Sequence, residues 1–509
     1  MALISIIEDF HPRIDAGLLA RAEALRPALR HEDRLPLPFD GAPLGKGAEL
    51  LLDFGEHLVG RVTLTLGTAG SHPDAPATVK LFFAETLREL DEDPAAFNGW
   101  LSRSWIQEET VHVDELPGIL TLPRRYAFRY LRITVLDTSP KYRLIVEKAV
   151  CRTETSADRT RVKPLCSGDE KLDRIHAVSL KTLADCMQEV FEDGPKRDRR
   201  LWLGDLRLQA LTNAVSFRNF DLVKRCLYLF GGSRFPDGRV SANVFAGARP
   251  EGDDTFLFDY ALLFPAALEE YLEETNDAEA LDDLYPIAME QIDYGLRQQE
   301  DGLVNAAAVK DCFIDWSDML DRTACAGALL LYALRYAQRL AERKGDAARL
   351  EELRRQSAAL RAALLRRFWS EDEQCFVSNG QISAASQVWM VLADAGTPEQ
   401  ARQAMRRALS LRGRAHMTTP YIHHYFVMAL LKAGLRAEAE QHLKDYWGGM
   451  LDAGADTFWE CWEPEKPGSS PYGGLIVNSF CHAWSCTPAY IIEKHLLNQD
   501  TKADRRKRV

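Results

Sequence analysis

Residues 191–205, FEDGPKRDRRLWLGD, combine acidic, basic and aromatic side chains in a way that the amphipathic sequence around them does not. They include four carboxylates, three arginines and one tryptophan. The order Asp-Gly-Pro at 193–195 is typical of a helix N-terminus, because aspartate caps the first turn and proline fits inside it. In a continuing helix, Asp198, Trp202 and Asp205 would share one face. Such a face fits either a solvated ion-pair surface or a sugar site, where an indole stacks on the ring and carboxylates bind hydroxyls.

A second unusual stretch, residues 454–485, places tryptophans and glutamates in a segment rich in glycine, proline and serine. Trp459 and Trp462 flank Glu460. Indole rings in a loop would waste apolar area in bulk water, so we expect them to line a pocket that holds Glu460 between two indoles. The alternative is that the indoles fill the centre of the domain and the acids lie on its rim.

Two shorter stretches have weaker patterns of the same kind. In KDCFIDWSDML, Asp315 lies beside Trp316, and in RPEGDDTFLFDY, Asp253 and Asp254 precede Tyr260. Each pattern also fits a helix cap, and neither indicates a site alone.

Two carboxylates that are far apart in sequence and surrounded by aromatic residues are typical of glycoside hydrolysis. One protonates the leaving oxygen, and the other acts as a base or a nucleophile. No nucleophile elbow, P-loop or dinucleotide-binding fingerprint is present, and we expect no cofactor. The pairs His423-His424 and Cys481-His482 lack the spacing of a structural zinc site, so we expect no metal.

The sequence pattern changes near residue 155, and the segments before it have the character of strands. They alternate with period two and are rich in valine, isoleucine, threonine and phenylalanine, at 60–68, 77–87, 108–116, 130–137 and 142–152. We expect an antiparallel β-sandwich over residues 46–157. A helix and a proline-rich lead-in occupy residues 1–45.

After residue 155, apolar residues recur at helical spacing through most of the chain. About twelve helices are expected between 168 and 496, including short ones at 204–217, 383–395 and 397–409. No motif recurs at a fixed period, which disfavours a repeat solenoid. The fold class we predict is multidomain and mainly α, with an (α/α)6 barrel as the catalytic domain in 158–496 and a basic tail in 497–509.

Composition limits the partners of the chain. It has 509 residues, 46% of them hydrophobic, and a formal net charge of -12, which disfavours nucleic acid and anionic membrane as partners. No window is long and apolar enough to span a bilayer, and the N-terminus does not resemble a signal peptide. The ten cysteines include no C-x-x-C pair. We therefore expect reduced thiols and a cytoplasmic protein.

The two unusual stretches resemble motifs of the α-L-rhamnosidases of glycoside hydrolase family 78. The family signature D-x-P-x-R-[DE]-x-x-x-W-x-x-D is present without a gap at 193–205. GADTFWECW at 454–462 is similar to a second family motif, and NSFCHAWS at 478–485 resembles the histidine segment that follows it. Two strand sequences are also similar, LDFGEHLVGRVTL and YAFRYLRITV, so the resemblance extends from about residue 50 to 490.

This resemblance implies an inverting mechanism in which Asp198 is the general acid and Glu460 the general base. It also suggests further side chains that bind rhamnose or shape the site: Asp193, Arg197, Trp202, Asp205, Asp315, Trp316, Trp459 and His482. Asp198 stands where the family usually has glutamate, and Cys461 replaces an arginine often found after the base. The chain would be a minimal member that lacks most of the family's accessory β-domains.

The expected activity is therefore that of an exo-acting α-L-rhamnosidase on small rhamnosides, such as disaccharides and flavonoid glycosides. One alternative is another glycosidase on the same barrel, which a substrate panel would distinguish. Another is a non-catalytic sugar-binding protein, which would bind sugar without turnover. A homodimer is one arrangement that would cover apolar surface of so compact a member.

Overall fold

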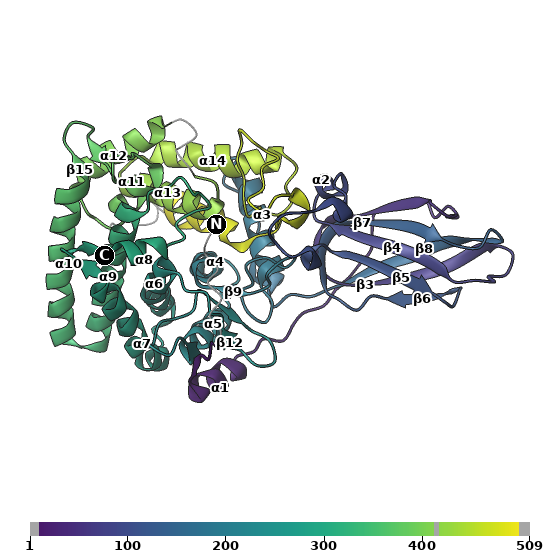
Figure 1. Cartoon of the computed structure of the whole chain (residues 1–509), viewed down its shortest axis with the longest axis horizontal. Coiled ribbons are helices and arrows are strands. Elements are labelled where there is room, and N and C mark those ends of the chain that lie inside the picture. The colour runs from purple at the N-terminus through teal and green to yellow at the C-terminus, as the bar shows by residue number, and fades with distance from the viewer. Residues whose placement is uncertain (1–9, 412–416, 498–509) are drawn as a thin grey trace.

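An antiparallel sheet domain and a larger helical domain lie at opposite ends of the long axis of the molecule (Figure 1). The computed structural model describes residues 10–411 and 417–497. Apart from residue 497, the predicted basic tail lies outside the described residues, and so do residues 1–9.

The sheet domain is formed by seven strands in which every pair is antiparallel. The order is β2-β8-β3-β7-β4-β5, and β6 also pairs with β3. The longer strands lie where the alternating sequence predicted them. Their bounds are β2 Asp33–Arg34, β3 Glu49–Gly70, β4 Ala77–Ala84, β5 Glu108–Val113, β6 Gly118–Thr121, β7 Tyr126–Asp137 and β8 Tyr142–Thr153.

Strand β3 is 22 residues long, and its two ends pair with different strands, which divides the domain into two halves. Its first part pairs with β7, and from Gly60 onward it pairs with β8. Gly60 is required at the junction, because a Cβ there would lie 2.4 Å from the carbonyl oxygen of Arg152. The two halves share one apolar core, to which β3, β4, β7 and β8 contribute. The antiparallel strands and their shared core agree with the predicted β-sandwich, in which β3 links the two halves through continuous strand pairing.

The helical domain contains helices that pack in sequential pairs. One series of helices packs side by side, each on the next, in the order α4, α6, α9, α11 and α13. Helix α15 contacts α4 and α3. A second series packs on the first, each helix on the one that precedes it in the sequence: α5, α7, α10, α12 and α14. Helix α9 is buried along most of its length, whereas α10 buries only a narrow face. The bounds are α3 Glu170–Cys186, α4 Leu203–Val215, α5 Phe220–Gly232, α6 Phe258–Thr275, α7 Ala278–Arg297, α8 Ala306–Lys310, α9 Thr323–Lys344, α10 Ala347–Phe368, α11 Ala384–Leu392, α12 Pro398–Ser410, α13 Pro420–Lys432, α14 Arg436–Asp452 and α15 Pro488–Ile491.

The helix predicted from Asp193 onward does not form. Residues 187–200, all of which are described, are turns and irregular backbone, and α4 begins only at Leu203. The Asp193 amide donates to the Arg200 carbonyl at 3.0 Å, which closes a loop. Asp198 within it has φ 63°, in the left-handed region. The local pattern is overridden because several charged side chains of this loop are buried and bind groups elsewhere in the chain.

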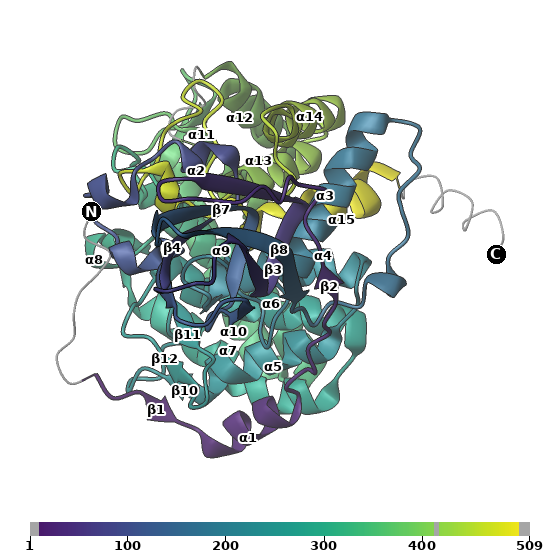
Figure 2. The ribbon, with the colours of Figure 1, turned by 90° about the vertical axis from the view of Figure 1, so that its right-hand side faces the viewer.

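The N-terminal segment packs on the helical domain, although the sheet domain follows it in the sequence. Helix α1, Ala16–Ala24, contacts α5, and the Asp15 amide donates to the Gly232 carbonyl at 2.8 Å. Strand β1, Arg13–Ile14, pairs with β10, Ser233–Arg234. Figure 2 shows α1 along the lower edge of the helical domain.

The ten cysteines are free thiols, and eight of them are buried. Within residues 10–411 and 417–497, no helix has the length and apolar character needed to cross a lipid bilayer.

Candidate active site

The two unusual sequence stretches meet at the guanidinium group of Arg197. One of its terminal nitrogens hydrogen-bonds the carboxylate of Glu460, and the other lies 3.5 Å from a carboxylate oxygen of Asp198. The Nε atom donates to the carbonyl of Val477 at 2.9 Å, and the group stacks over the Tyr472 ring at 4.2 Å. Arg197 therefore brings both predicted catalytic carboxylates to one place.

Glu460 is buried, and both its carboxylate and its backbone are hydrogen-bonded. The Tyr472 hydroxyl donates to one carboxylate oxygen, and Arg197 donates to the other. Its backbone amide donates to the Ser479 carbonyl at 3.0 Å, and its carbonyl accepts the Trp484 indole N–H at 3.0 Å. The position of this carboxylate is therefore fixed by both its side chain and its backbone.

Asp198 is less tightly held, with its side chain 19% exposed. Aspartate tolerates the left-handed backbone that this turn requires better than most residues do. The two arginines that follow are engaged with other groups. Arg199 donates to the Arg125 carbonyl at 2.9 Å, and Arg200 lies over the Phe245 ring at 4.4 Å.

Two further carboxylates, Asp193 and Asp205, are buried beside this pair. Burial raises the pKa of Asp193 well above its ordinary value, and the negative charges of Asp198 and Asp205 raise it further. Burial also raises the pKa of Asp205, which lies 3.3 Å from His482 Nε2. Carboxyl groups in such a cluster can accept or donate hydrogen bonds, as recognition of sugar hydroxyls requires.

Aromatic rings from distant segments form a continuous wall in this region. Trp202 meets Tyr260 edge-on with ring centroids 6.4 Å apart. Phe313 stacks on Trp484 at 5.9 Å and contacts Trp316 at 5.2 Å. The wall therefore combines β9, Leu201–Trp202, with α6 and the loops before α9 and α15.

Tyr472 and Trp100 also lie in this region, although the sequence patterns did not predict them as site residues. Tyr472 lies in the second stretch, in SSPYGG, and contacts Glu460 directly. Trp100 belongs to the sheet domain, is 41% exposed, and lies 5.5 Å from Tyr472 and 6.5 Å from Trp316 between ring centroids. No local pattern marks Trp100, because its neighbours come from the other domain.

Asp315 and Trp459 face other partners. Asp315 accepts hydrogen bonds from the Thr418 amide and the Thr419 hydroxyl, both at 2.6 Å, and burial raises its pKa to about 6. Trp459 packs against Trp462 at 5.1 Å and Phe480 at 5.3 Å. Glu460 is thus flanked by Arg197 and Tyr472 rather than by two indoles, because the neighbouring indoles pack on each other.

The sheet domain supplies charged groups behind the site. Lys196 is 1% exposed and forms an ion pair with Glu89, with Glu85 at 3.8 Å. Its ammonium group also donates to the Asn478 carbonyl at 2.9 Å. Both partner carboxylates come from the segment that follows β4, so the loop that carries Asp198 is fastened to the sheet domain.

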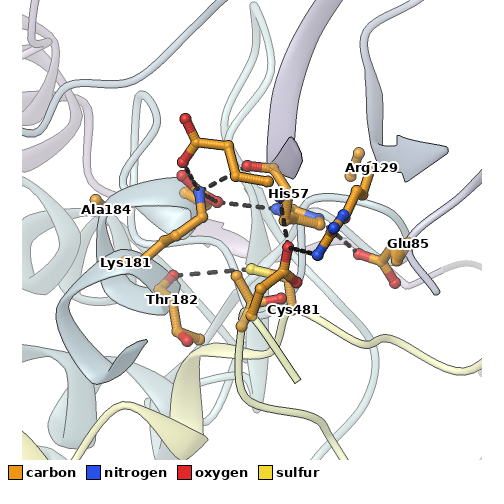
Figure 3. Close-up of polar contacts among 12 residues, drawn as sticks. His57, Glu85, Arg129, Lys181, Thr182, Ala184 and Cys481 are labelled. Carbon is orange, nitrogen blue, oxygen red and sulfur yellow. Dashed lines mark hydrogen bonds and ion pairs between the residues drawn. The ribbon is translucent and has the colours of Figure 1, made fainter. Parts of the chain in front are cut away.

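One buried cluster consists of side chains of the types that bind metal ions, but their hydrogen bonds do not suit a metal site. Donor atoms of His57, Asp185 and Cys481 lie within 4.8 Å of one another (Figure 3). However, both nitrogens of His57 hydrogen-bond carboxylates, Asp185 at 2.8 Å and Glu85 at 3.0 Å. Lys181 also contacts Asp185, at 3.1 Å. A metal ion needs a free ring nitrogen, whereas this arrangement needs a proton on each.

A cavity of about 510 Å³ lies elsewhere in the helical domain, and its walls include α4, α6, α9 and α13. Arg207, Glu270 and Lys432 contribute to its lining, and Arg207 pairs with Glu270 at 2.6 Å. None of the predicted site residues, all of which the structure describes, lines this cavity. The candidate site is therefore defined by the convergence of the two sequence motifs.

Two carboxylates beside one guanidinium, within an aromatic wall, are a constellation of the glycoside hydrolase type. Residues 37–153 match the glycosyl hydrolase family 78 α-rhamnosidase N-terminal domain, and residues 162–496 match the bacterial α-L-rhamnosidase six-hairpin glycosidase domain. A rhamnosidase from Klebsiella oxytoca, solved with rhamnose bound, is 42% identical with a TM-score of 0.93, over 96% of this chain and 100% of that one. The chain therefore belongs to glycoside hydrolase family 78, the α-L-rhamnosidases.

Other relatives are longer. The structure of a family 78 rhamnosidase from Bacillus sp. GL1 is similar with a TM-score of 0.76 and 21% identity, over 90% of this chain and 47% of that one. The α-L-rhamnosidase of Streptomyces avermitilis is 24% identical over 460 residues, which are 86% of this chain. This chain spans 41% of the length of that curated relative.

Proposed function

We propose that this protein is an exo-acting, inverting α-L-rhamnosidase that removes terminal α-L-rhamnose from small rhamnosides. The observation that carries the proposal is the placement of Asp198 and Glu460 on the single guanidinium group of Arg197. Membership of the family supports the proposal, and so does the similarity, over 96% of this chain, to a rhamnosidase solved with rhamnose bound.

In this mechanism Asp198 is the general acid and Glu460 the general base. Asp198 gives its proton to the glycosidic oxygen as the bond to the anomeric carbon breaks, and the aglycone leaves as an alcohol. Glu460 takes a proton from water as the water oxygen bonds to the anomeric carbon from the opposite face. Inversion requires carboxyl groups about 6.5–9.5 Å apart, which leaves room for the water. The product is β-L-rhamnose.

The other candidate site residues would bind the sugar between the carboxyl groups of Asp198 and Glu460. Asp193, Arg197, Asp205 and His482 are buried polar groups of the right chemistry for ring hydroxyls. The indoles that would stack on the ring or shape the entrance are Trp202 and Trp316 of the aromatic wall and Trp100 of the sheet domain. For Asp315 and Trp459 we propose an indirect contribution, through the packing of the loops that carry the site.

We place the site at one end of an (α/α)6 barrel. The sequential packing of α4, α6, α9, α11 and α13, with α15 on α4, supports a closed ring of inner helices. The six-hairpin description of the matching domain supports the same arrangement. A homodimer and a cytoplasmic location remain predictions.

The test is turnover of p-nitrophenyl α-L-rhamnopyranoside, with the first product anomer identified by proton NMR. We expect nitrophenol release and β-L-rhamnose as the initial product. An initial α-anomer would contradict inversion. Turnover of other glycosides in a panel, but not of rhamnosides, would indicate another glycosidase, and rhamnose binding without any turnover would indicate a sugar-binding protein.

A further inference from the structure

The segment 478–482 lies directly behind the candidate base. The Glu460 amide donates to the Ser479 carbonyl at 3.0 Å, and the His482 amide donates to the Phe458 carbonyl at 2.8 Å. The Thr457 hydroxyl donates to the Phe480 carbonyl at 2.8 Å. These bonds run between the same two stretches of backbone, so the position of Glu460 depends on where the segment 478–482 is held.

That segment is held by the sheet domain. The Phe480 amide donates to one carboxylate oxygen of Glu85 at 2.7 Å. His57 Nε2 donates to the other oxygen of Glu85 at 3.0 Å, and His57 Nδ1 donates to Asp185 at 2.8 Å. Figure 3 shows His57 between Glu85 and the helix that carries Lys181, with Cys481 beside it. A chain of hydrogen bonds therefore leads from β3, through Glu85 and Phe480, to the backbone of Glu460.

Every side chain in this chain of bonds is buried: His57, Glu85 and Asp185 are at most 3% exposed. Burial opposes a charge on the His57 ring, but the Cys481 sulfur and the hydrogen bonds to Asp185 and Glu85 outweigh it and raise its pKa well above the ordinary value. Buried charges cost more than apolar packing of the same volume, so such a network is a poor way merely to join two domains. Fully hydrogen-bonded networks do fix one geometry.

We infer that Glu85 and His57 are positioning residues for Glu460, and that the sheet domain thereby sets the geometry of the base. This rests on the proposed function, in which Glu460 activates the attacking water. Without Glu85, the Phe480 amide loses its acceptor and the segment 478–482 is free to shift. A misplacement of about 1 Å in a catalytic group can cost about 10²-fold in rate.

The first experiment compares the wild type with Glu85→Ala and Glu85→Gln. We expect kcat to fall about 10- to 100-fold in Glu85→Ala, with a smaller change in KM. Glu85→Gln should lose less, because its amide oxygen can still accept from the Phe480 amide. His57→Gln leaves the hydrogen bond between Glu85 and the Phe480 amide in place. Its kcat should therefore also lie between those of the wild type and Glu85→Ala.

The matched control is Glu269→Gln. Glu269 is also a buried carboxylate, on α6, and pairs with Arg343 of α9 at 2.8 Å, without a hydrogen bond or ion pair to any candidate site residue. The Glu269→Gln substitution should lower the melting temperature but leave kcat per folded molecule within about twofold of wild type. If Glu85→Ala behaves like this control, Glu85 only stabilises the fold and the inference is overturned.

Hydrogen exchange of the backbone amides separates this inference from the proposed function. In Glu85→Ala the amides of Phe480 and Glu460 should exchange at least about tenfold faster than in wild type, and in Glu85→Gln, which keeps a weaker acceptor, they should exchange faster by a smaller factor, while those of α9 should not change. Unchanged exchange at both amides would overturn the inference whatever the activity. A wild type that hydrolyses no rhamnoside would refute the proposed function, and the exchange rates would still decide whether the sheet domain positions Glu460.

Discussion

The loop 193–200 and the segment 457–463 each supply one candidate catalytic carboxylate, but they hold it differently. Glu460 has a donor on each carboxylate oxygen and is also fixed through its backbone. Asp198 lies on a left-handed turn, partly exposed, with Arg197 at 3.5 Å. A base that must aim a water molecule benefits from a fixed position, whereas an acid must follow the leaving oxygen and exchange its proton with solvent. The contrast fits the proposed roles, because the proposed base is held firmly and the proposed acid is not.

The largest effect is expected for Glu460→Gln. The amide keeps the size of the side chain but cannot accept the proton of the attacking water. We expect kcat to fall about 10³- to 10⁴-fold, near the upper end for general base catalysis, for every leaving group. Steady-state kinetics with p-nitrophenyl rhamnoside and with a rhamnose-containing disaccharide would measure this. A loss of less than about tenfold would remove Glu460 from the role of base.

Asp198→Asn should produce a loss that depends on the leaving group. Asparagine also tolerates the left-handed backbone, so the turn is preserved and only the acidic proton is removed. We expect about 10²- to 10³-fold lower kcat/KM with the disaccharide and a clearly smaller loss with p-nitrophenyl rhamnoside, whose leaving group needs less protonation. Equal losses on both substrates would indicate that Asp198 binds the sugar instead of protonating the aglycone.

Tyr472→Phe tests whether the tight hold on Glu460 matters. The variant removes the hydroxyl donor but leaves the ring beneath the Arg197 guanidinium. Loss of one hydrogen bond to a charged group costs about 1.5 kcal/mol, so kcat should fall about tenfold. The matched control is Tyr336→Phe, which removes a hydroxyl that hydrogen-bonds Glu270 at 2.9 Å beside the 510 Å³ cavity. If both variants lose the same activity, the contact between Tyr472 and Glu460 has no special role.

The last prediction, with the smallest expected effect on activity, concerns the pH dependence of stability and involves Asp315. Burial raises its pKa to about 6, so the folded state binds this proton more tightly than the unfolded state does. Its contribution to stability is therefore full below about pH 4, the ordinary range for aspartate, and is lost as pH rises to about 6, by about 3 kcal/mol. In Asp315→Asn the fall in melting temperature between pH 4 and 6.5 should be shallower than in wild type. Parallel curves for the two proteins would contradict this assignment.

The sequence predicted well those features that local pattern determines. The period-two segments became β4, β5, β7 and β8, and the short helices predicted at 204–217, 383–395 and 397–409 are α4, α11 and α12. The two stretches that the sequence singled out also lie together, joined by Arg197, and the catalytic roles of Asp198 and Glu460 stay predictions. These successes share one cause: hydrophobic periodicity and motif spacing are readable without knowing the tertiary contacts.

The failures arise where tertiary contacts override the local signal. The Asp-Gly-Pro order predicted a helix, but burial of Lys196 and Arg197 against carbonyls near residue 478 gave a loop. His57 and Glu85 are single polar residues in or beside strands, and nothing near them in sequence indicates that they reach the other domain. Contacts between groups hundreds of residues apart leave no trace in a local pattern.

The ion pairs of Lys196 have a consequence for how this architecture can change by recombination. Its ammonium group is buried in the helical domain, yet both neighbouring carboxylates, Glu85 and Glu89, come from the sheet domain. Joining the helical domain to an unrelated N-terminal module would leave that ammonium group without a counter-charge, at a cost of about 3–5 kcal/mol. A successful chimera would therefore have to keep the acidic segment that follows β4 together with the helical domain.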